Sequence, residues 1–242
     1  MRRAFAGFLL ALTITVGVSP TGLRAQQGRP IVLLMHGRGM LGRDTAATRR
    51  DWLEAVQSGV ASLGVKSPLS AQDMRVVWYA DVLDGVSNAG CVYAKDDPRA
   101  RREATEDPNF KSFIALAGSI LNVVSSAVDD SAASLETRAL ASDAAFLADA
   151  RKRCAAEARL GDAIADAKQQ GRPIILVAHS LGAVAAYDYL SSRRDSNVVQ
   201  RFITLGSPLG SSIVRRILIG GDSTDVVSKL PSVRDWINIR HF

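Results

Sequence analysis

Short apolar runs, often entered by glycine or proline and followed by stretches with helical spacing, recur along this chain. Runs of this kind that alternate with helices are typical of a parallel β-sheet covered by helices. Strands are predicted at about 30–35, 74–79, 173–178, 202–205 and 233–239, and helices at about 45–63, 181–192 and 211–219. The sequence therefore predicts an α/β fold whose mostly parallel sheet has about five strands. The 242 residues suffice for one sizeable core.

The same four-residue motif introduces two of the predicted strands. Gly28–Ile31 and Gly171–Ile174 both read Gly-Arg-Pro-Ile, and the strands that follow lead to His36-Gly37 and to His179-Ser180. If these strands are parallel neighbours, their carboxyl ends open on the same edge of the sheet, where open α/β sheets bind ligands. We therefore expect the two loops to face one site.

The first 25 residues have the pattern of a secretory signal. Arg2 and Arg3 precede an apolar run, Ala4 to Val18, and small residues lead to Ala25. A membrane anchor is the alternative, but a run of about 15 residues is short against the roughly 20 of a spanning helix. We expect cleavage near Ala25, export to the periplasm or the extracellular space, and one globular domain over 26–242. Loss of the three signal arginines, the third being Arg24, lowers the formal charge from +6 to +3, so the charge gives no argument for a nucleic-acid partner.

The middle of the chain, about 83–170, has a different composition. It is rich in Ala, Ser, Asp and Arg, and apolar residues between Phe113 and Val124 follow helical spacing. We interpret it as an inserted helical cap. Packing of the apolar stripe on the body is favoured over direct membrane contact, and a lid with transient lipid contact is the alternative.

The two cysteines, Cys91 and Cys154, are expected to pair if the chain is exported. Together with only three histidines they form no recognisable metal-ligand spacing, so neither a metal nor another cofactor is predicted.

The segment 177–183 carries the strongest chemical signal, because it lies where a buried strand turns directly into a helix. Ser180 stands at the turn, with His179 before it. Ala178 and Gly182, two positions away on either side, are small enough for a sharp bend. Such a bend lifts the serine hydroxyl above the sheet and aims the amides of the new helix, with Leu181 first, at a developing oxyanion. No phosphate-binding glycine motif is present, which disfavours a nucleotide-binding protein.

His36, Gly37 and Arg38 form the second signal. An oxyanion hole commonly takes one amide from the residue after the nucleophile and one from the loop after a neighbouring strand. Arg38 is the candidate for the second amide, and its side chain is expected to stay in solvent.

On these motifs the sequence resembles the α/β-hydrolase superfamily, in its lipase and esterase branch. The segment 204–208, Thr-Leu-Gly-Ser-Pro, is also similar to one in inositol-deacylase-like esterases. The resemblance covers about 30–239 apart from the cap. It implies a minimal α/β-hydrolase with a serine nucleophile acting on a small-molecule or lipid ester.

The base and the acid of the triad fit the family pattern less well. His36 belongs to the oxyanion loop, and the side chain of His179 is expected to point away from the base position, which leaves His241 as the candidate base. For the acid, Asp222 and Asp225 are candidates, Asp235 is expected at the wrong end of the sheet, and Asp188 is interpreted as a solvated helix residue. The final strand of the family fold is apparently missing, so a truncated or non-catalytic hydrolase-like scaffold is the alternative function.

Overall fold

The computed structural model describes residues 28–83, 90–95, 97, 99, 143, 146–147, 149–210, 214 and 230–239. Several predictions lie outside these residues. They concern the signal segment, most of the cap, nearly all of the helix at 211–219, Asp222, Asp225 and His241.

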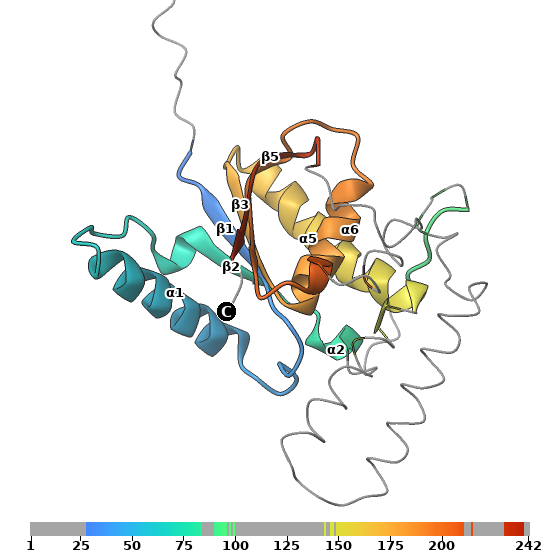
Figure 1. Ribbon diagram of the computed structural model, residues 1–242, viewed down its shortest axis with the longest axis horizontal. Coiled ribbons are helices and arrows are strands. Elements are labelled where there is room, and N and C mark those ends of the chain that lie inside the picture. The colour runs from blue at the N-terminus through green and yellow to red at the C-terminus, as the bar shows by residue number, and fades with distance from the viewer. Residues whose placement is uncertain are drawn as a thin grey trace, which may run out of the picture.

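The five predicted strands form one sheet in which every neighbouring pair is parallel (Figure 1). The order across the sheet is β2-β1-β3-β4-β5. The strands are β1 (Ile31–Met35), β2 (Met74–Val77), β3 (Ile174–His179), β4 (Val199–Leu205) and β5 (Val233–Ile239). The predicted fold class, an α/β fold with a parallel sheet of about five strands, is confirmed.

The register places β1 and β3, the two strands introduced by the Gly-Arg-Pro-Ile motif, side by side. Ile31 is paired with Ile174, and Met35 with Ala178. The carboxyl ends of the next strands meet at the same edge, since the Ser180 amide donates to the carbonyl of Leu205 (2.9 Å). The expectation that the loops after β1 and β3 share one edge of the sheet is therefore confirmed.

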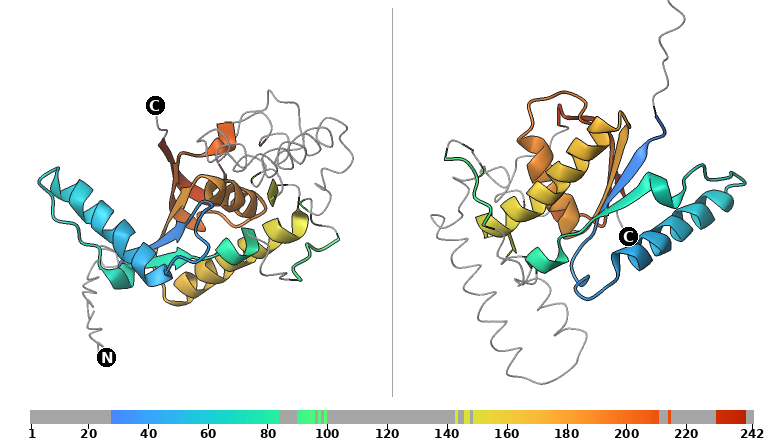
Figure 2. Two further views of the ribbon diagram at one scale, coloured as in Figure 1. Left: turned by 90° about the horizontal axis from the view of Figure 1, so that it is seen from below. Right: turned by 180° about the vertical axis from the view of Figure 1, so that it is seen from behind.

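Helices cover both faces of the sheet (Figures 1 and 2). On one face lies α1 (Thr45–Ala61), whose first amides are capped by Asp44 (2.7 Å to Ala46 N). On the other lie α5 (Ala150–Gln169) and α6 (Leu181–Ser191), over the larger apolar core. A short helix, α2 (Ala80–Leu83), follows β2, and 3₁₀ turns occur at Ala71–Asp73 and Pro208–Gly210.

Helix α5 lies inside the segment that the sequence assigned to the cap, yet it packs on the sheet. Leu160, Ile164 and Ala167 are buried with the strand residues in the main core. Its amphipathic stripe is made of small residues, which allow close contact with α6 but give a weak hydrophobic signal. The end of the cap segment therefore contributes to the body of the domain.

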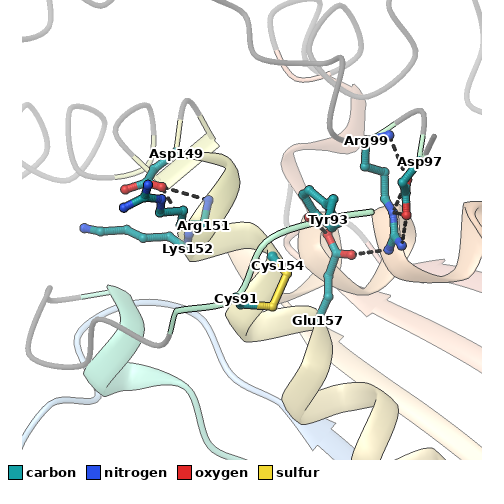
Figure 3. The surroundings of a disulfide bond; sticks show 9 residues. All are labelled: Cys91, Tyr93, Asp97, Arg99, Asp149, Arg151, Lys152, Cys154 and Glu157. Atoms are coloured by element: carbon teal, nitrogen blue, oxygen red, sulfur yellow. Dashed lines mark hydrogen bonds and ion pairs between the residues drawn. A yellow bond between two sulfur atoms is a disulfide. The ribbon is translucent and has the colours of Figure 1, made fainter. Parts of the chain in front are cut away.

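A disulfide joins Cys91 to Cys154, which confirms the predicted pairing (Figure 3). It fastens the segment 90–99 to α5. Next to it, the Tyr93 hydroxyl donates to Glu157 Oε1 (2.7 Å) and the Arg99 guanidinium donates to Glu157 Oε2. Polar contacts and a covalent bond thus hold the same segment on the outer side of α5.

Reduction of this disulfide is expected to lower the free energy of unfolding by about 4 kcal/mol, because the bond closes a loop of 63 residues in the unfolded chain. The measurement is urea unfolding with and without dithiothreitol. A variant with both cysteines changed to alanine is the control, since its stability should be low and unaffected by reductant. Equal stability of the oxidised and reduced wild-type protein would contradict the prediction.

The carboxyl group of Glu157 is 2% exposed, and burial together with the nearby Asp188 carboxylate raises its pKa to about 8. The folded protein therefore holds this proton more tightly than the unfolded chain does. The resulting stability is complete below the unfolded pKa of about 4.5 and is lost as the pH rises through about 8.

Relative to a Glu157→Gln variant, which cannot titrate, the wild-type free energy of unfolding is expected to fall between pH 5 and pH 8, by at most about 1.4 kcal/mol per pH unit. Denaturant unfolding of both proteins across that range measures the difference. Glu54→Gln, on the exposed face of α1, is the control and should show no such slope. A constant difference between wild type and Glu157→Gln would contradict the assignment.

Asp188 corrects a prediction: it is not a solvated helix residue. Its side chain is 1% exposed and faces the equally buried Arg153 of α5 (Asp188 Oδ2 to Arg153 Nε, 3.9 Å). The Arg153 guanidinium also donates to the Leu147 carbonyl. A charge buried on α6 is tolerated because α5 supplies the opposite charge, a pairing that local helical spacing does not reveal.

Candidate active site

Ser180 is the single residue between β3 and α6, and its backbone is strained. Its φ of 52° and ψ of −124° lie in a region that residues other than glycine rarely adopt. Within the described part of the chain, Asn197 is the other residue with a side chain at positive φ. The strand-to-helix turn therefore has the sharp geometry that the sequence predicted around this serine.

The Ser180 side chain does not cap the helix that it precedes. Serine at this position usually accepts a hydrogen bond from an amide of the first turn, which would occupy both groups. Here the positive φ turns the side chain away, and the residue stays half-buried at the edge of the sheet. Its hydroxyl is thus available for other chemistry.

Gly182 and Ala178 provide the space for this turn. A Cβ on Gly182 would lie 2.4 Å from the carbonyl oxygen of His36 and 2.7 Å from that of Met35, so the start of α6 rests directly on the end of β1. Ala178 is completely buried in the core below the turn. The predicted need for small residues at both positions agrees with these contacts.

His36 orients the loop after β1. Its side chain is 4% exposed and stacks on Tyr79, with ring centroids 4.3 Å apart. His36 Nε2 accepts from the Tyr79 amide (3.2 Å) and Nδ1 lies 2.5 Å from the Gly37 carbonyl oxygen. A carbonyl only accepts, so the proton is on Nδ1 and the ring is neutral. The Tyr79 hydroxyl donates to the His36 carbonyl, which fixes the backbone further.

This arrangement determines where the Arg38 amide points. In a trans peptide the C=O and the N–H of one unit point in opposite directions, and the described residues contain no cis bond. Because the Gly37 carbonyl is held towards His36, the N–H of Arg38 points away from it. Gly37 itself lies against the turn, since a Cβ there would be 3.1 Å from Ser180 Cβ.

Two amides near the turn have no partner among the described residues. Neither the Arg38 amide nor the Leu181 amide donates a hydrogen bond to another described residue. Leu181 is the first residue of α6, where amides have no acceptor within the helix and carry a partial positive charge. The site therefore contains a free serine hydroxyl and amides suited to a negatively charged oxygen.

The Arg38 side chain is exposed, as expected, but it also makes an ion pair. Its Nη1 lies 3.1 Å from Asp143 Oδ2, in an ion pair whose side chains are 38% and 20% exposed. Sequence reasoning missed both Asp143, which is distant in the chain, and Tyr79. The position of Tyr79 two residues after the end of β2, at the site edge, was the signal that could have found it.

The described histidines do not provide an evident base. Both ring nitrogens of His36 are bonded as above. His179 is exposed and lies between the loops after β1 and β4, with Nδ1 and Nε2 beside Gly37 and Gly206. Partial desolvation by these loops lowers its pKa. Asp235 pairs with Arg201 (3.7 Å) towards the amino-terminal end of the sheet, away from Ser180, as expected.

The described residues also bear on membrane-spanning helices and on metal sites. No helix among them is both long and apolar enough to cross a membrane. In the same residues, no group of three or more His, Cys, Asp and Glu side chains is arranged to hold a metal ion.

Comparison with known proteins gives one family match. Residues 159–234 match the lecithin:cholesterol acyltransferase family, over a segment that runs from α5 through the Ser180 turn to the start of β5. No curated protein matches the chain. The parallel α/β sheet and this match together fit the α/β-hydrolase superfamily.

Proposed function

We propose that the protein is a serine hydrolase that cleaves carboxylic esters through an acyl-enzyme on Ser180. The observation that carries the proposal is the Ser180 turn, where an uncapped hydroxyl is accompanied by the amides of Leu181 and Arg38, which have no partner among the described residues. The Ser180 oxygen attacks the ester carbonyl and the two amides hold the resulting oxyanion. The alcohol leaves with a proton, and water then releases the acid and restores the serine.

The family match supports a proposal for the substrate class. The family is named for an acyltransferase that acts on lecithin and cholesterol, so we propose a lipid ester as the acyl donor. Hydrolysis and acyl transfer share the acyl-enzyme and differ only in whether water or an alcohol accepts the acyl group. Assignment to the lipase and esterase branch belongs to this proposal.

We assign the general base to His241, which follows β5 by two residues. Strand β5 ends beside the site, because the Ile239 carbonyl accepts from the amide of Gly206 (3.0 Å). The acid that orients this histidine is left unassigned. We further propose export after cleavage near Ala25, in keeping with the disulfide, and a single domain over 26–242 with a cap that contacts lipid transiently.

A non-catalytic hydrolase-like scaffold is the second candidate function. It is favoured by the bonding of His36, whose ring nitrogens are already engaged at the site. A scaffold would keep the turn and the loop but would not activate the serine.

A fluorophosphonate probe separates the two candidates. Labelling of the folded wild-type protein that is absent in Ser180→Ala supports an activated nucleophile, whereas an unlabelled folded wild type would refute catalysis. His241→Ala tests the base: it should lose ester turnover while keeping its fold, and undiminished turnover would remove His241 from the mechanism.

A further inference from the structure

We propose that the ion pair between Arg38 and Asp143 positions the Arg38 amide for oxyanion binding, which makes Asp143 a positioning residue for the chemistry at Ser180. The inference rests on the proposed function, because it assigns a purpose to the loop that would form half of the oxyanion hole. Neither the sequence motifs nor the family match includes Asp143.

The loop after β1 is fixed on one side of Arg38 and open on the other. Before Arg38, the carbonyls of His36 and Gly37 are hydrogen-bonded, and Gly37 is buried against the Ser180 turn. After Arg38, Gly39 has φ of +74° and nothing would lie within 4 Å of a Cβ placed on it. A glycine in open surroundings gives the backbone freedom to rotate. The peptide that carries the Arg38 N–H is held at its Gly37 end by the hydrogen bond that the Gly37 carbonyl accepts from His36, and the ion pair with Asp143 holds Arg38 at its other end.

Asp143 is a suitable anchor because it lies close in the chain to residues that are buried in the core. It is followed closely by Phe146 and Leu147, which are 1% and 4% exposed in the main core. The Leu147 carbonyl accepts from the buried guanidinium of Arg153 on α5. Asp143 thus connects the oxyanion loop to an element that packs on the body.

The electrostatic setting favours a specific pair over a general surface contact. Burial raises the pKa of Asp143, and the positive charge of Arg38 acts in the opposite direction. Removal of either charge should leave Ser180 and its turn unchanged. It should, however, leave the Arg38 peptide held through the Gly37 carbonyl alone, so that its N–H can shift from the oxyanion position.

Loss of the pair should therefore lower kcat more than it raises KM. An amide that points in the wrong direction weakens only the interaction formed with the transition state, and small misplacements of this kind cost about 10- to 100-fold in rate. Because the pair is partly exposed, it contributes little to folding, and thermal stability should change little.

The experiment measures kcat and KM on p-nitrophenyl butyrate, fluorophosphonate labelling stoichiometry and thermal unfolding. The variants are Asp143→Asn, Arg38→Met, their double mutant, and Arg38→Lys, which restores the charge. Arg43→Met is the matched control, since Arg43 is an exposed arginine of the same loop. We expect both single variants to lose kcat about 10- to 100-fold with full labelling, the double mutant to be no worse than either, Arg38→Lys to recover part of the rate and Arg43→Met to equal wild type.

The outcomes separate the two proposals. An unlabelled, inactive wild type would refute the proposed function itself. A labelled wild type with unchanged kcat in Asp143→Asn, or with independent losses that multiply in the double mutant, would overturn the positioning role alone. If Asp143→Asn unfolds, Arg38→Met and Arg38→Lys decide the question, because that side chain is the more exposed of the two.

Discussion

Turnover of p-nitrophenyl butyrate by the Ser180→Ala variant is expected to be at least a thousandfold lower than that of the wild type. Removal of the nucleophile abolishes the acyl-enzyme and leaves only the amides of Leu181 and Arg38, which stabilise an oxyanion but cannot attack the ester. The loss should appear in kcat, because substrate binding does not require the hydroxyl.

The fold of Ser180→Ala should be retained. The hydroxyl makes no capping hydrogen bond, and alanine keeps the same Cβ at the strained backbone, so the free energy of unfolding should stay within about 1 kcal/mol of wild type. Ser62→Ala, at the distant end of α1, controls for loss of a hydroxyl and should turn over normally. Comparable activity in Ser180→Ala and wild type would assign the turnover to another group or to a contaminant.

The sheet was predictable because each strand carries its own signal. Short apolar runs bounded by turn residues mark buried parallel strands, and a repeated Gly-Arg-Pro-Ile identified the adjacent pair that flanks the site. The strand-to-helix turn was equally visible, since a serine between small residues at that junction has few other geometries open to it. Local sequence thus specifies the strands, their neighbours at the centre of the sheet and the position of Ser180.

The misjudged features depend on partners that are distant in the chain. Asp188 was interpreted as solvated because its helix gives no sign that Arg153 lies opposite. The ion pair of Arg38 was missed because Asp143 lies in a segment whose composition indicates only a cap. In both cases the partner of a charge is decided by tertiary contacts, which no local spacing encodes.

Helix α5 illustrates the same limit at the level of an element. Its residues include Arg153 and Glu157, which are 1% and 2% exposed. The charged residues of this helix are therefore partly buried, although in the sequence they suggest an exposed surface. The partners that contact these side chains come from α6 and from the segment held by the disulfide. The sequence of α5 alone therefore indicates a polar cap, and only the tertiary contacts show that the helix belongs to the body of the domain.

Replacing Gly182 with alanine is expected to destabilise the protein by about 3 kcal/mol or more and to reduce fluorophosphonate labelling of the molecules that still fold. Alanine should improve helix formation by about 1 kcal/mol. The new Cβ, however, would lie 2.4 Å from the His36 carbonyl oxygen and 2.7 Å from that of Met35. These are backbone atoms of β1 and its loop, in the core, and they cannot yield as a flexible side chain does, so overpacking outweighs the gain in helix propensity.

The matched control is Gly59→Ala in α1, where nothing lies within 4 Å of the added Cβ and the helical gain stands alone. That variant should be more stable than wild type by up to about 1 kcal/mol, so the same chemical change is expected to have opposite signs in the two helices. Urea unfolding measures both. Because the Gly182 contact joins the Ser180 turn to the oxyanion loop, any relaxation that relieves the overlap must separate the nucleophile from the Arg38 amide. A Gly182→Ala protein with wild-type stability and wild-type labelling would show that the two do not depend on this contact.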